Sequence, residues 1–249
     1  YMKQKRILTL FQISSFLIFF CFVFQIQSSH SQVTSLNIDI DFVSNYLHRG
    51  ISKTSNNPAI QFDIKYNIPQ SNVNIGLWKS NINQYGLSSE YQYSVDYSSK
   101  FNFIDYSVGY IYYDFGNSTY TPQELILKAN FLNFDFDYAQ TIIGNQLNIN
   151  NSENSKYFQI TSAIPLNFNY EFFTRFGINL FSGDDNDKYN YQNITYGVSK
   201  DIYFFETEFS YNKNIFKNSD YKPEDISSDV FMLKIKTKLS NENKIGLRK

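Results

Sequence analysis

The chain has 249 residues, of which 22 are Lys or Arg and 23 are Asp or Glu, so its formal net charge is −1. This balance argues against a nucleic-acid-binding protein, which needs a basic excess or patch. The only cysteine is Cys21. The sequence after it therefore forms no disulfide and no cysteine-ligated metal site.

The N-terminus has the order of charges and apolar residues that is typical of a secretory signal. Lys3, Lys5 and Arg6 precede an apolar stretch over residues 7–24, and the small residues of Ser29-His30-Ser31 follow it. We expect residues 1–31 to be a signal peptide and residues 32–249 to be the exported domain. The alternative is an N-terminal membrane anchor. No later stretch approaches the ~18–20 apolar residues of a membrane-spanning helix, so a membrane-embedded domain would have to be a β-barrel.

From residue 36 onward, apolar and polar residues alternate with a period of two, which predicts β-strands. Most predicted strands are close to the ~9–11 residues that a tilted transmembrane strand needs. Twelve strands are expected, at residues 36–42, 60–66, 73–80, 89–97, 102–113, 124–131, 134–143, 157–164, 168–181, 193–199, 202–211 and 230–239, followed by a polar tail at 240–249.

The predicted connections alternate in length. Long ones lie at residues 49–57, 81–88, 114–123, 144–156, 182–192 and 212–229, and short ones at 68–72, 98–100, 132–133, 165–167 and 200–201. Long external loops that alternate with short periplasmic turns are typical of a bacterial outer-membrane barrel. An even number of strands places both ends of the domain on the periplasmic side.

The two faces of the predicted strands differ strongly. One face carries rows such as Tyr91, Tyr110, Phe136 and Phe172, with Lys79 as its only charge, at a strand end. The opposite face carries most of the strand carboxylates and amines. A transmembrane barrel places the apolar face on lipid and the polar face on the lumen. A soluble sandwich would place the apolar face inside, and would then have to find partners for many buried tyrosine hydroxyls.

We therefore predict an all-β fold, a single transmembrane antiparallel up-and-down barrel of about twelve strands. The side chains expected to line its lumen are Asp39, Asp41, Arg49, Asp63, Lys65, Trp78, Asp96, Asp105, Glu124, Lys128, Asp135, Asp137, Glu171, Arg175, Glu206, Glu208, Lys234 and Lys236. Acids exceed bases among them, which predicts a weak preference for cations.

The segment at residues 41–61, DFVSNYLHRGISKTSNNPAIQ, resembles the opening motif of the TorF-like porin family of Gram-negative outer-membrane barrels. The matching residues are Ser44, Tyr46, Arg49, Gly50, Ile51, Ser52, Pro58, Ala59 and Gln61. Gly76-Leu77-Trp78 and the segment at 106–113 also resemble strands of that family. The resemblance implies a small outer-membrane barrel with passive transport. The polar tail departs from the terminal aromatic that such barrels use in assembly, so the end of the last strand stays open.

Four features of the sequence allow two interpretations each. Arg49 either lines or gates the pore entrance, or it pairs with a carboxylate while Gly50 supplies a turn with positive φ. His48 is expected at the outer interface rather than in a catalytic site, because no nucleophile motif accompanies it. Trp78 either narrows the lumen or fills space beside Gly76. The acidic loop at 183–187 is either a Ca²⁺ site or a solvated loop.

The sequence predicts a non-enzymatic porin of the Gram-negative outer membrane that passes ions or small solutes through a narrow polar lumen. The alternative is a non-conducting structural or adhesive barrel whose external loops carry the function. Expected partners are membrane lipid, the solutes, the barrel-assembly machinery and further copies in a homo-oligomer. No cofactor, metal or nucleic acid is expected.

Overall fold

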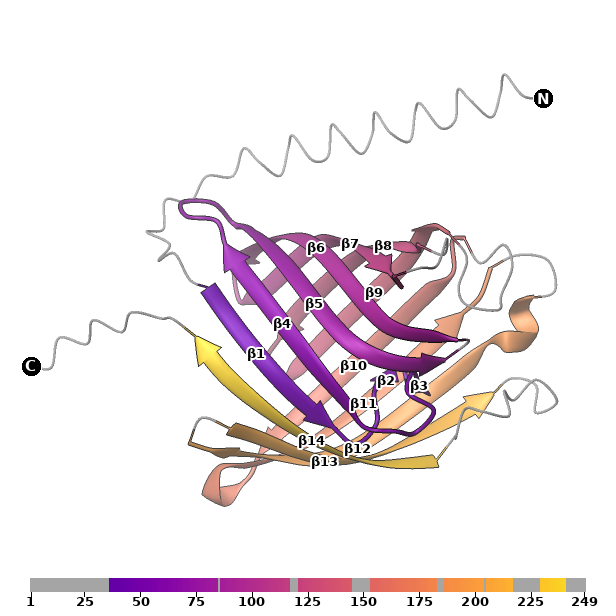
Figure 1. The fold of residues 1–249 in the computed structure, drawn as a ribbon. Coiled ribbons are helices and arrows are strands. Elements are labelled where there is room, and N and C mark those ends of the chain that lie inside the picture. The colour runs from indigo at the N-terminus through magenta and orange to yellow at the C-terminus, as the bar shows by residue number, and fades with distance from the viewer. Residues whose placement is uncertain are drawn as a thin grey trace, which may run out of the picture. The chain divides into compact units, whose positions relative to one another are not determined.

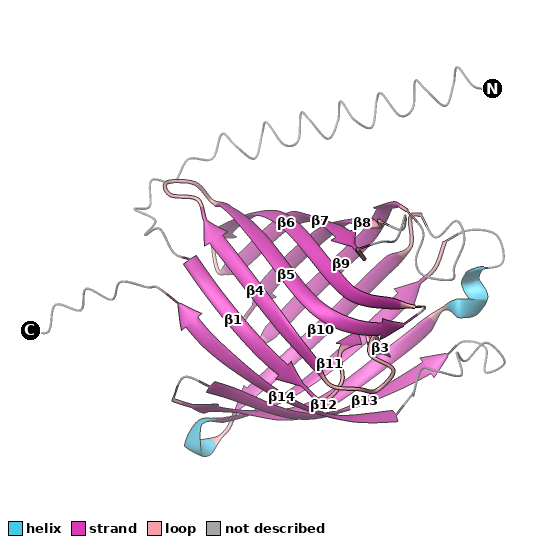
Figure 2. Ribbon diagram, viewed as in Figure 1, coloured by secondary structure: helices cyan, strands magenta, loops and turns pink. Residues whose placement is uncertain are grey.

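The structure is a computed structural model, and it describes residues 36–84, 86–116, 121–144, 153–182, 186–203, 205–216 and 229–240. The predicted signal peptide and the end of the polar tail lie outside the described residues. In the described part, almost every residue belongs to a strand or a short connection, and only two 3-10 turns interrupt this pattern (Figure 2).

Twelve long strands form the wall of the fold. They are β1 (Leu36–Val43), β4 (Ala59–Asn67), β5 (Val73–Gln84), β6 (Leu87–Phe101), β7 (Ile104–Asp114), β8 (Gln123–Phe131), β9 (Phe134–Ile143), β10 (Lys156–Pro165), β11 (Tyr170–Leu180), β12 (Tyr191–Ile202), β13 (Phe205–Phe216) and β14 (Asp229–Ser240). A separate two-stranded sheet pairs β2 (Leu47–His48) with β3 (Ile51–Ser52). The 3-10 turns are η1 (Asn167–Asn169) and η2 (Asn186–Tyr189).

The wall is a closed antiparallel barrel in which each long strand pairs with its neighbours in the chain and β1 closes the ring against β14 (Figure 1). Closure removes the free edges that an open sheet would expose. The register of the closing pair sets Asp39 opposite Lys238 and Asp41 opposite Lys236. The prediction of a twelve-stranded antiparallel barrel is confirmed.

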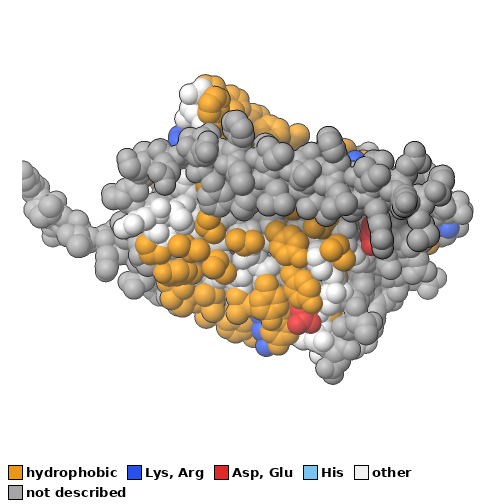
Figure 3. All heavy atoms as spheres, turned by 90° about the horizontal axis from the view of Figure 1, so that it is seen from above, with side chains coloured by type: hydrophobic (Ala, Val, Ile, Leu, Met, Phe, Trp, Pro, Cys, Tyr) orange, Lys and Arg blue, Asp and Glu red, His pale blue; other side chains and the backbone are white. Residues whose placement is uncertain are grey.

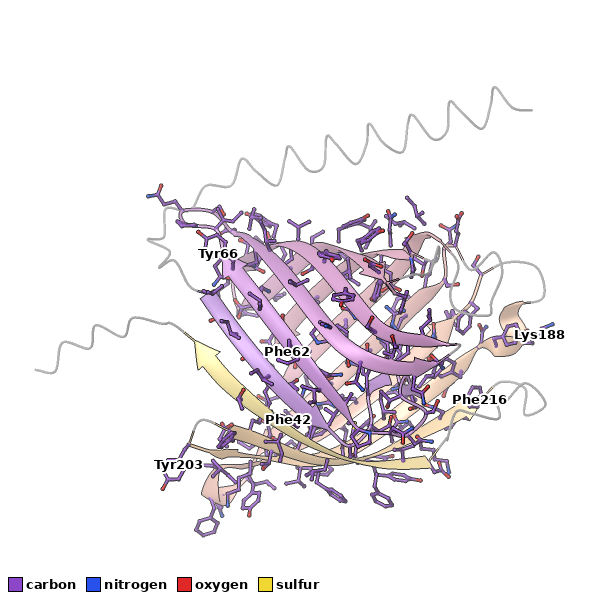
Figure 4. The ribbon with its side chains drawn as sticks, viewed as in Figure 1. Phe42, Phe62, Tyr66, Lys188, Tyr203 and Phe216 are labelled. Carbon is purple, nitrogen blue, oxygen red and sulfur yellow. The ribbon has the colours of Figure 1, made fainter. Side chains whose placement is uncertain are left out.

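The outer face of the barrel is apolar. Phe62, Phe136, Ile160 and Phe209 are exposed by 44%, 41%, 44% and 56%, and similar side chains follow on the other strands. Figure 3 shows one side of the barrel, where the uncovered side chains are largely hydrophobic. Phe42 and Phe62 lie on this face in Figure 4. The soluble sandwich is therefore wrong, because the apolar rows do not form a closed interior.

The barrel has two different ends. At one end, the short-turn end, successive strands are separated by residues 68–72, 102–103, 132–133, 166–169 and 203–204. At the other, the long-loop end, they are separated by residues 44–58, 115–122, 144–155, 181–190 and 217–228, of which 117–120, 145–152, 183–185 and 217–228 lie outside the described residues, as does 204. The alternation of lengths is thus observed, with one exception. The connection expected at 81–88 is only two residues long, because β5 continues to Gln84 and β6 begins at Leu87. Gly86, with φ of +76°, allows so tight a turn.

Other strand boundaries also differ from the prediction. The short connections expected at 98–100 and 200–201 are wrong, because β6 continues to Phe101, β12 continues to Ile202 and β13 begins at Phe205. Residue Asn102 lies in a turn with φ of 53°, so β7 begins only at Ile104. The segment at 167–169 forms η1, so β11 begins at Tyr170. Strand β13 continues to Phe216 through residues that were expected in a loop. In each case the hydrogen bonding of the neighbouring strand, and not the local pattern, decides where the strand ends.

Candidate functional site: a loop that crosses the lumen

The first long connection does not extend away from the barrel. Residues 44–58, which we call the inserted loop, fold into the lumen at the long-loop end, where β2 and β3 are drawn inside the outline of the barrel (Figure 1). The loop makes hydrogen bonds to strands on different sides of the barrel, which are described below. It begins at Ser44, whose backbone amide donates to the carbonyl of Leu233 on β14 at 2.9 Å.

A buried asparagine holds the inserted loop in shape. The side-chain carbonyl of Asn45, 2% exposed, accepts hydrogen bonds from Ser52 at 2.7 Å and Thr54 at 3.1 Å. Its amide donates to Asn56 at 2.8 Å. Short polar side chains that bond their own loop fix a turn without secondary structure elsewhere. The loop is therefore held in shape by hydrogen bonds among its own polar side chains.

The tip of the inserted loop is the two-residue turn between β2 and β3. Arg49 has φ of 53° and Gly50 has φ of 81°. Positive φ at both central residues is the requirement of a type I′ hairpin turn. A Cβ on Gly50 would lie 2.5 Å from Oδ1 of Asn214 and 2.6 Å from Cβ of Asn193. Glycine is thus required here both for the turn and for the close approach to the opposite wall.

The guanidinium of Arg49 reaches Glu124 on β8. It donates two hydrogen bonds to the carboxylate, at 2.9 and 2.6 Å, and the two side chains are 10% and 5% exposed. Tyr113 donates to the same carboxylate at 2.8 Å, and Thr141 donates to it at 3.4 Å. The guanidinium also lies 4.8 Å from the ring centre of Tyr157. A planar, bidentate, stacked contact of this kind is specific to arginine.

The backbone of the tip is held from the other side. The hydroxyl of Tyr191 donates to the carbonyl of Arg49 at 3.0 Å. The amides of Asn212 and Asn214 on β13 donate to the carbonyl of Gly50 at 3.1 and 2.7 Å. In the order of the barrel, β8 and β10 both lie far around the ring from β1, where the loop begins. The tip therefore crosses the lumen.

The base of the inserted loop packs on an apolar cluster inside the barrel. Tyr46 lies 5.3 Å from the ring centre of Trp78, and both belong with Val43, Ile82 and Phe115 to this cluster. Tyr46 also donates to Oε1 of Glu90 at 3.2 Å. Apolar burial on the lumen side is unexpected for an open channel. It indicates that the loop is part of the folded interior.

Arg49 and His48, two neighbouring residues of the inserted loop, have pKa values that are shifted in opposite directions. Burial opposes the protonation of Arg49, but the Glu124 carboxylate outweighs it and raises the pKa of the guanidinium above its usual value. Burial lowers the pKa of His48 well below its usual value, and Arg49 and Lys53 lower it further. Arg49 is thus held as a cation, whereas His48 is held neutral.

Four further ion pairs join lumen side chains of different strands. Lys236 lies 2.8 Å from Asp39, Lys234 lies 2.8 Å from Asp41, Lys65 lies 3.1 Å from Asp96, and Arg175 lies 3.0 Å from Glu208. Among the described residues, the structure shows no ion pair for the acids Asp63, Asp135, Asp137 and Glu171, or for the base Lys128, which lies opposite Asp137 in the register. These charges leave an acidic excess in the part of the lumen nearer the short-turn end.

The predicted lumen residues divide into two groups. Arg49, Glu124, Glu208 and Arg175 lie toward the inserted loop and are brought together in pairs. Asp105 lies at the rim of the short-turn end, 57% exposed, where it pairs with Lys100. Lys128, Asp135 and Glu171 are also exposed, and Asp137 and Glu206 are half-buried.

The two interpretations of Arg49 and Trp78 are now distinguishable. Arg49 pairs with a wall carboxylate while Gly50 supplies the positive-φ turn. Trp78 faces inward and packs on Tyr46 of the inserted loop. The expected position of His48 at the outer interface is wrong, because its ring meets Tyr113 inside the barrel with centres 6.2 Å apart. The chain leaves the wall before His48, so the alternation of β1 does not apply to it.

Sequence reasoning missed the wall residues that receive the tip, namely Tyr113, Tyr157, Tyr191, Asn212 and Asn214. The first three are large aromatics on the polar parity of their strands, near the long-loop end. Their placement could have predicted a segment inside the barrel, because a large aromatic side chain that faces the lumen needs another group to pack against. Asn212 and Asn214 carried no signal, since asparagine is common throughout this sequence.

Other kinds of site are not seen in the described ranges. None of the helices there is long and apolar enough to cross a membrane. No group of three or more His, Cys, Asp or Glu side chains in these ranges is arranged to hold a metal ion. The acidic loop at 183–187 is described only in part, and residues 183–185 lie outside the described residues.

Residues 27–210 match a family described as "Bacterial protein of unknown function (Gcw_chp)". The chain belongs to the Gcw_chp family. The matched segment contains the whole inserted loop and the carboxylate that binds its tip. No curated protein sequence matches this Gcw_chp chain. The narrower resemblance to TorF-like porins stays a prediction.

Solved structures similar to this Gcw_chp protein are membrane barrels. The NanC porin aligns with a TM-score of 0.51 at 12% identity, over 82% of this chain and 100% of NanC. A protein from work on in-meso crystallization of membrane proteins aligns with a TM-score of 0.53 at 8% identity, over 85% and 86%. OccAB3 of Acinetobacter baumannii aligns with a TM-score of 0.42 at 8% identity, over 80% of this chain and 60% of OccAB3. At these identities the likeness shows the fold.

Proposed function

We propose that this Gcw_chp protein is a channel of the Gram-negative outer membrane through which ions and small solutes pass passively, and that the inserted loop restricts the passage. The observation that carries the proposal is the inverted polarity of a closed barrel, with aromatic rows outside and paired and unpaired charges inside. A closed barrel satisfies its backbone without water, so it can span lipid. A charged lumen offers water and ions a path across it.

The number of strands sets the scale of that path. Eight strands leave a lumen filled by side chains, and roughly 16–18 leave an open aqueous channel. Twelve strands lie between these limits. The inserted loop narrows the passage further at one end, where Arg49 and Glu124 meet at 2.6 Å. We expect ions and small solutes to pass and larger ones to be excluded.

The acidic excess near the short-turn end supports a weak preference for cations. Asp63, Asp135, Asp137 and Glu171 have no ion pair among the described side chains, whereas Lys128 is the one base of the predicted lumen set without such a pair and the other five are paired with acids. Fixed carboxylates raise the local concentration of cations. Membrane lipid and the barrel-assembly machinery are the partners that this proposal requires. Self-association stays a prediction.

A second function is favoured by one specific observation. The tip of the inserted loop is bound on both sides and its polar partners are buried, which is also what a closed structural or adhesive barrel would show. Such a barrel would not conduct, and its external loops would carry the function. The two proposals differ in one measurable property, the conductance of the intact chain.

Reconstitution in planar bilayers tests both proposals. The wild-type protein is compared with a variant in which residues 47–52 are replaced by a short Gly-Ser linker. We expect small single-channel steps for the wild type, larger steps for the variant, and a reversal potential in a salt gradient that favours cations. A silent wild type with a conducting variant would support the structural barrel. Silence of both would refute the channel, and anion preference would refute the charge argument.

A further inference from the structure

The short turns between strands carry unusual residues at their tips. Leu132, Phe168 and Tyr203 are exposed by 72%, 84% and 100%, and Phe101 and Phe103 by 68% and 65%. In Figure 4, Tyr203 extends from the short-turn end of the barrel, opposite to the end that carries Lys188 and Phe216. Turn tips of a protein surrounded by water are normally small or polar.

The backbone conformation at these tips disfavours the large side chains that they carry. Leu132, Phe168 and Tyr203 have φ of 54°, 62° and 55°. Positive φ is disfavoured for bulky residues, and Gly, Asn or Asp usually occupies such positions. Neither the turn nor packing among the described residues explains large apolar side chains there. A contact with an apolar medium would explain them.

The turn at 68–72 differs from the other four short turns, because it carries no large apolar side chain that is exposed, and its positive φ of 58° belongs to Gln70. In the turn at 102–103 the positive φ also belongs to a polar residue, Asn102, and the exposed apolar side chains are its neighbours Phe101 and Phe103. The apolar tips therefore cover the arc of the rim from β6 to β13, and the turn between β4 and β5 lies outside it.

We propose that the apolar turn tips of this arc are embedded in the lipid leaflet on the short-turn side, so that they anchor the barrel at a fixed depth. The proposal requires the barrel to be in a membrane, but it does not require the lumen to conduct. It commits to lipid because the exposed apolar residues of the wall extend to the tips. Phe103 of one tip lies 5.3 Å from the ring of Phe131 on the wall, and Phe134 and Phe136, with rings 6.4 Å apart, are the exposed wall residues that follow the tip with Leu132.

Lys200, which lies near two of these tips, is placed where it could contact lipid headgroups. The side chain of Lys200 lies over the ring of Tyr170, 4.2 Å from its centre, and donates to its hydroxyl at 3.1 Å. Both residues belong to strands that end at the turns with Phe168 and Tyr203. Long basic side chains that lie along an aromatic ring place their charge at the level of lipid headgroups. A fluid surface also fits apolar tips that are spread over a wide arc, whereas a protein partner would need one compact patch.

Nitroxide labels measure this depth directly. Single cysteines are placed at 132, 168 and 203 in the full chain, with the only native cysteine removed by Cys21→Ser, and the protein is reconstituted in phospholipid vesicles. Collision with oxygen, which concentrates in lipid, is compared with collision with a water-soluble nickel chelate. Gln70→Cys is the matched control at a polar tip, and Ile160→Cys, at a wall position that is 44% exposed, is the lipid reference.

We expect the ratio of oxygen to nickel collisions at 132, 168 and 203 to be several-fold higher than at 70 and to approach that at 160. Water-like ratios at 132, 168 and 203, far below that at 160, would overturn the proposal. A low ratio at 160 would instead show that the wall does not face lipid, which would refute the membrane channel itself. In the Ile160→Cys protein, the added substitutions Leu132→Asn, Phe168→Asn and Tyr203→Asn suit positive φ and should leave the barrel folded, but they should shift the label at 160 toward the aqueous collision rate.

Discussion

Loss of the Arg49–Glu124 ion pair should release the inserted loop. The substitution Glu124→Gln keeps the size of the side chain but removes the charge that faces a buried guanidinium, with the two side chains only 10% and 5% exposed. Breaking a buried pair by removing one charge costs about 3–5 kcal/mol, because the other charge stays buried without compensation. Three backbone-directed hydrogen bonds, from Tyr191, Asn212 and Asn214, remain to hold the tip.

The magnitude follows from these terms. The remaining neutral hydrogen bonds, about 1 kcal/mol each, are present before and after the substitution and do not change this loss. At about 1.4 kcal/mol for each factor of ten, a loss of about 3–5 kcal/mol lowers the ratio of inserted to released loop by roughly two to three and a half orders of magnitude. We expect larger or more frequent conductance steps in planar bilayers. We also expect a red shift of tryptophan emission, because Trp78, the single tryptophan, packs on Tyr46 of the loop.

The matched control is Glu171→Gln. It removes a carboxylate of the same lumen face that is exposed near the short-turn end and lies opposite Ser199, away from the inserted loop. Its emission and single-channel steps should resemble those of the wild type. If Glu124→Gln also leaves both readouts unchanged, the ion pair does not hold the loop, and the reasoning is refuted even if the barrel does not conduct.

Three further results are expected. Gly50→Val should prevent insertion of the tip, because its Cβ would lie 2.5 Å from Oδ1 of Asn214 and φ is +81°; limited proteolysis should then cut the loop, and an uncut loop would contradict this. Phe62→Lys should destabilise the folded barrel by about 2–4 kcal/mol in urea titrations in lipid, whereas Thr161→Lys, on the lumen face, should cost little; equal costs would contradict the assigned orientation. Because burial, Arg49 and Lys53 lower the pKa of His48, the released loop binds a proton more readily than the inserted one, so insertion should weaken as pH falls below about 6.5. Trp78 emission should report this shift, and His48→Asn should remove it; a profile unchanged in the variant would refute the assignment to His48.

The sequence alone determined the wall of this protein. Alternation with a period of two is a local property, since neighbouring side chains of a strand must point to opposite faces. The rows containing Phe62, Phe136 and Phe172 therefore showed both the strands and their lipid-facing side before any tertiary contact was known. The alternation of short and long connections gave the up-and-down order in the same way, except at Gly86.

The tertiary structure decided the path of the first loop and the role of its motif. The sequence singled out Arg49 and Gly50 but could not choose between an open rim and a paired tip. Their partners, Glu124 and Asn212, are 75 and 162 positions away in the chain, so only closure of the ring brings them together. His48 was misplaced for the same reason, because a pattern that describes a strand carries no information once the chain has left the wall.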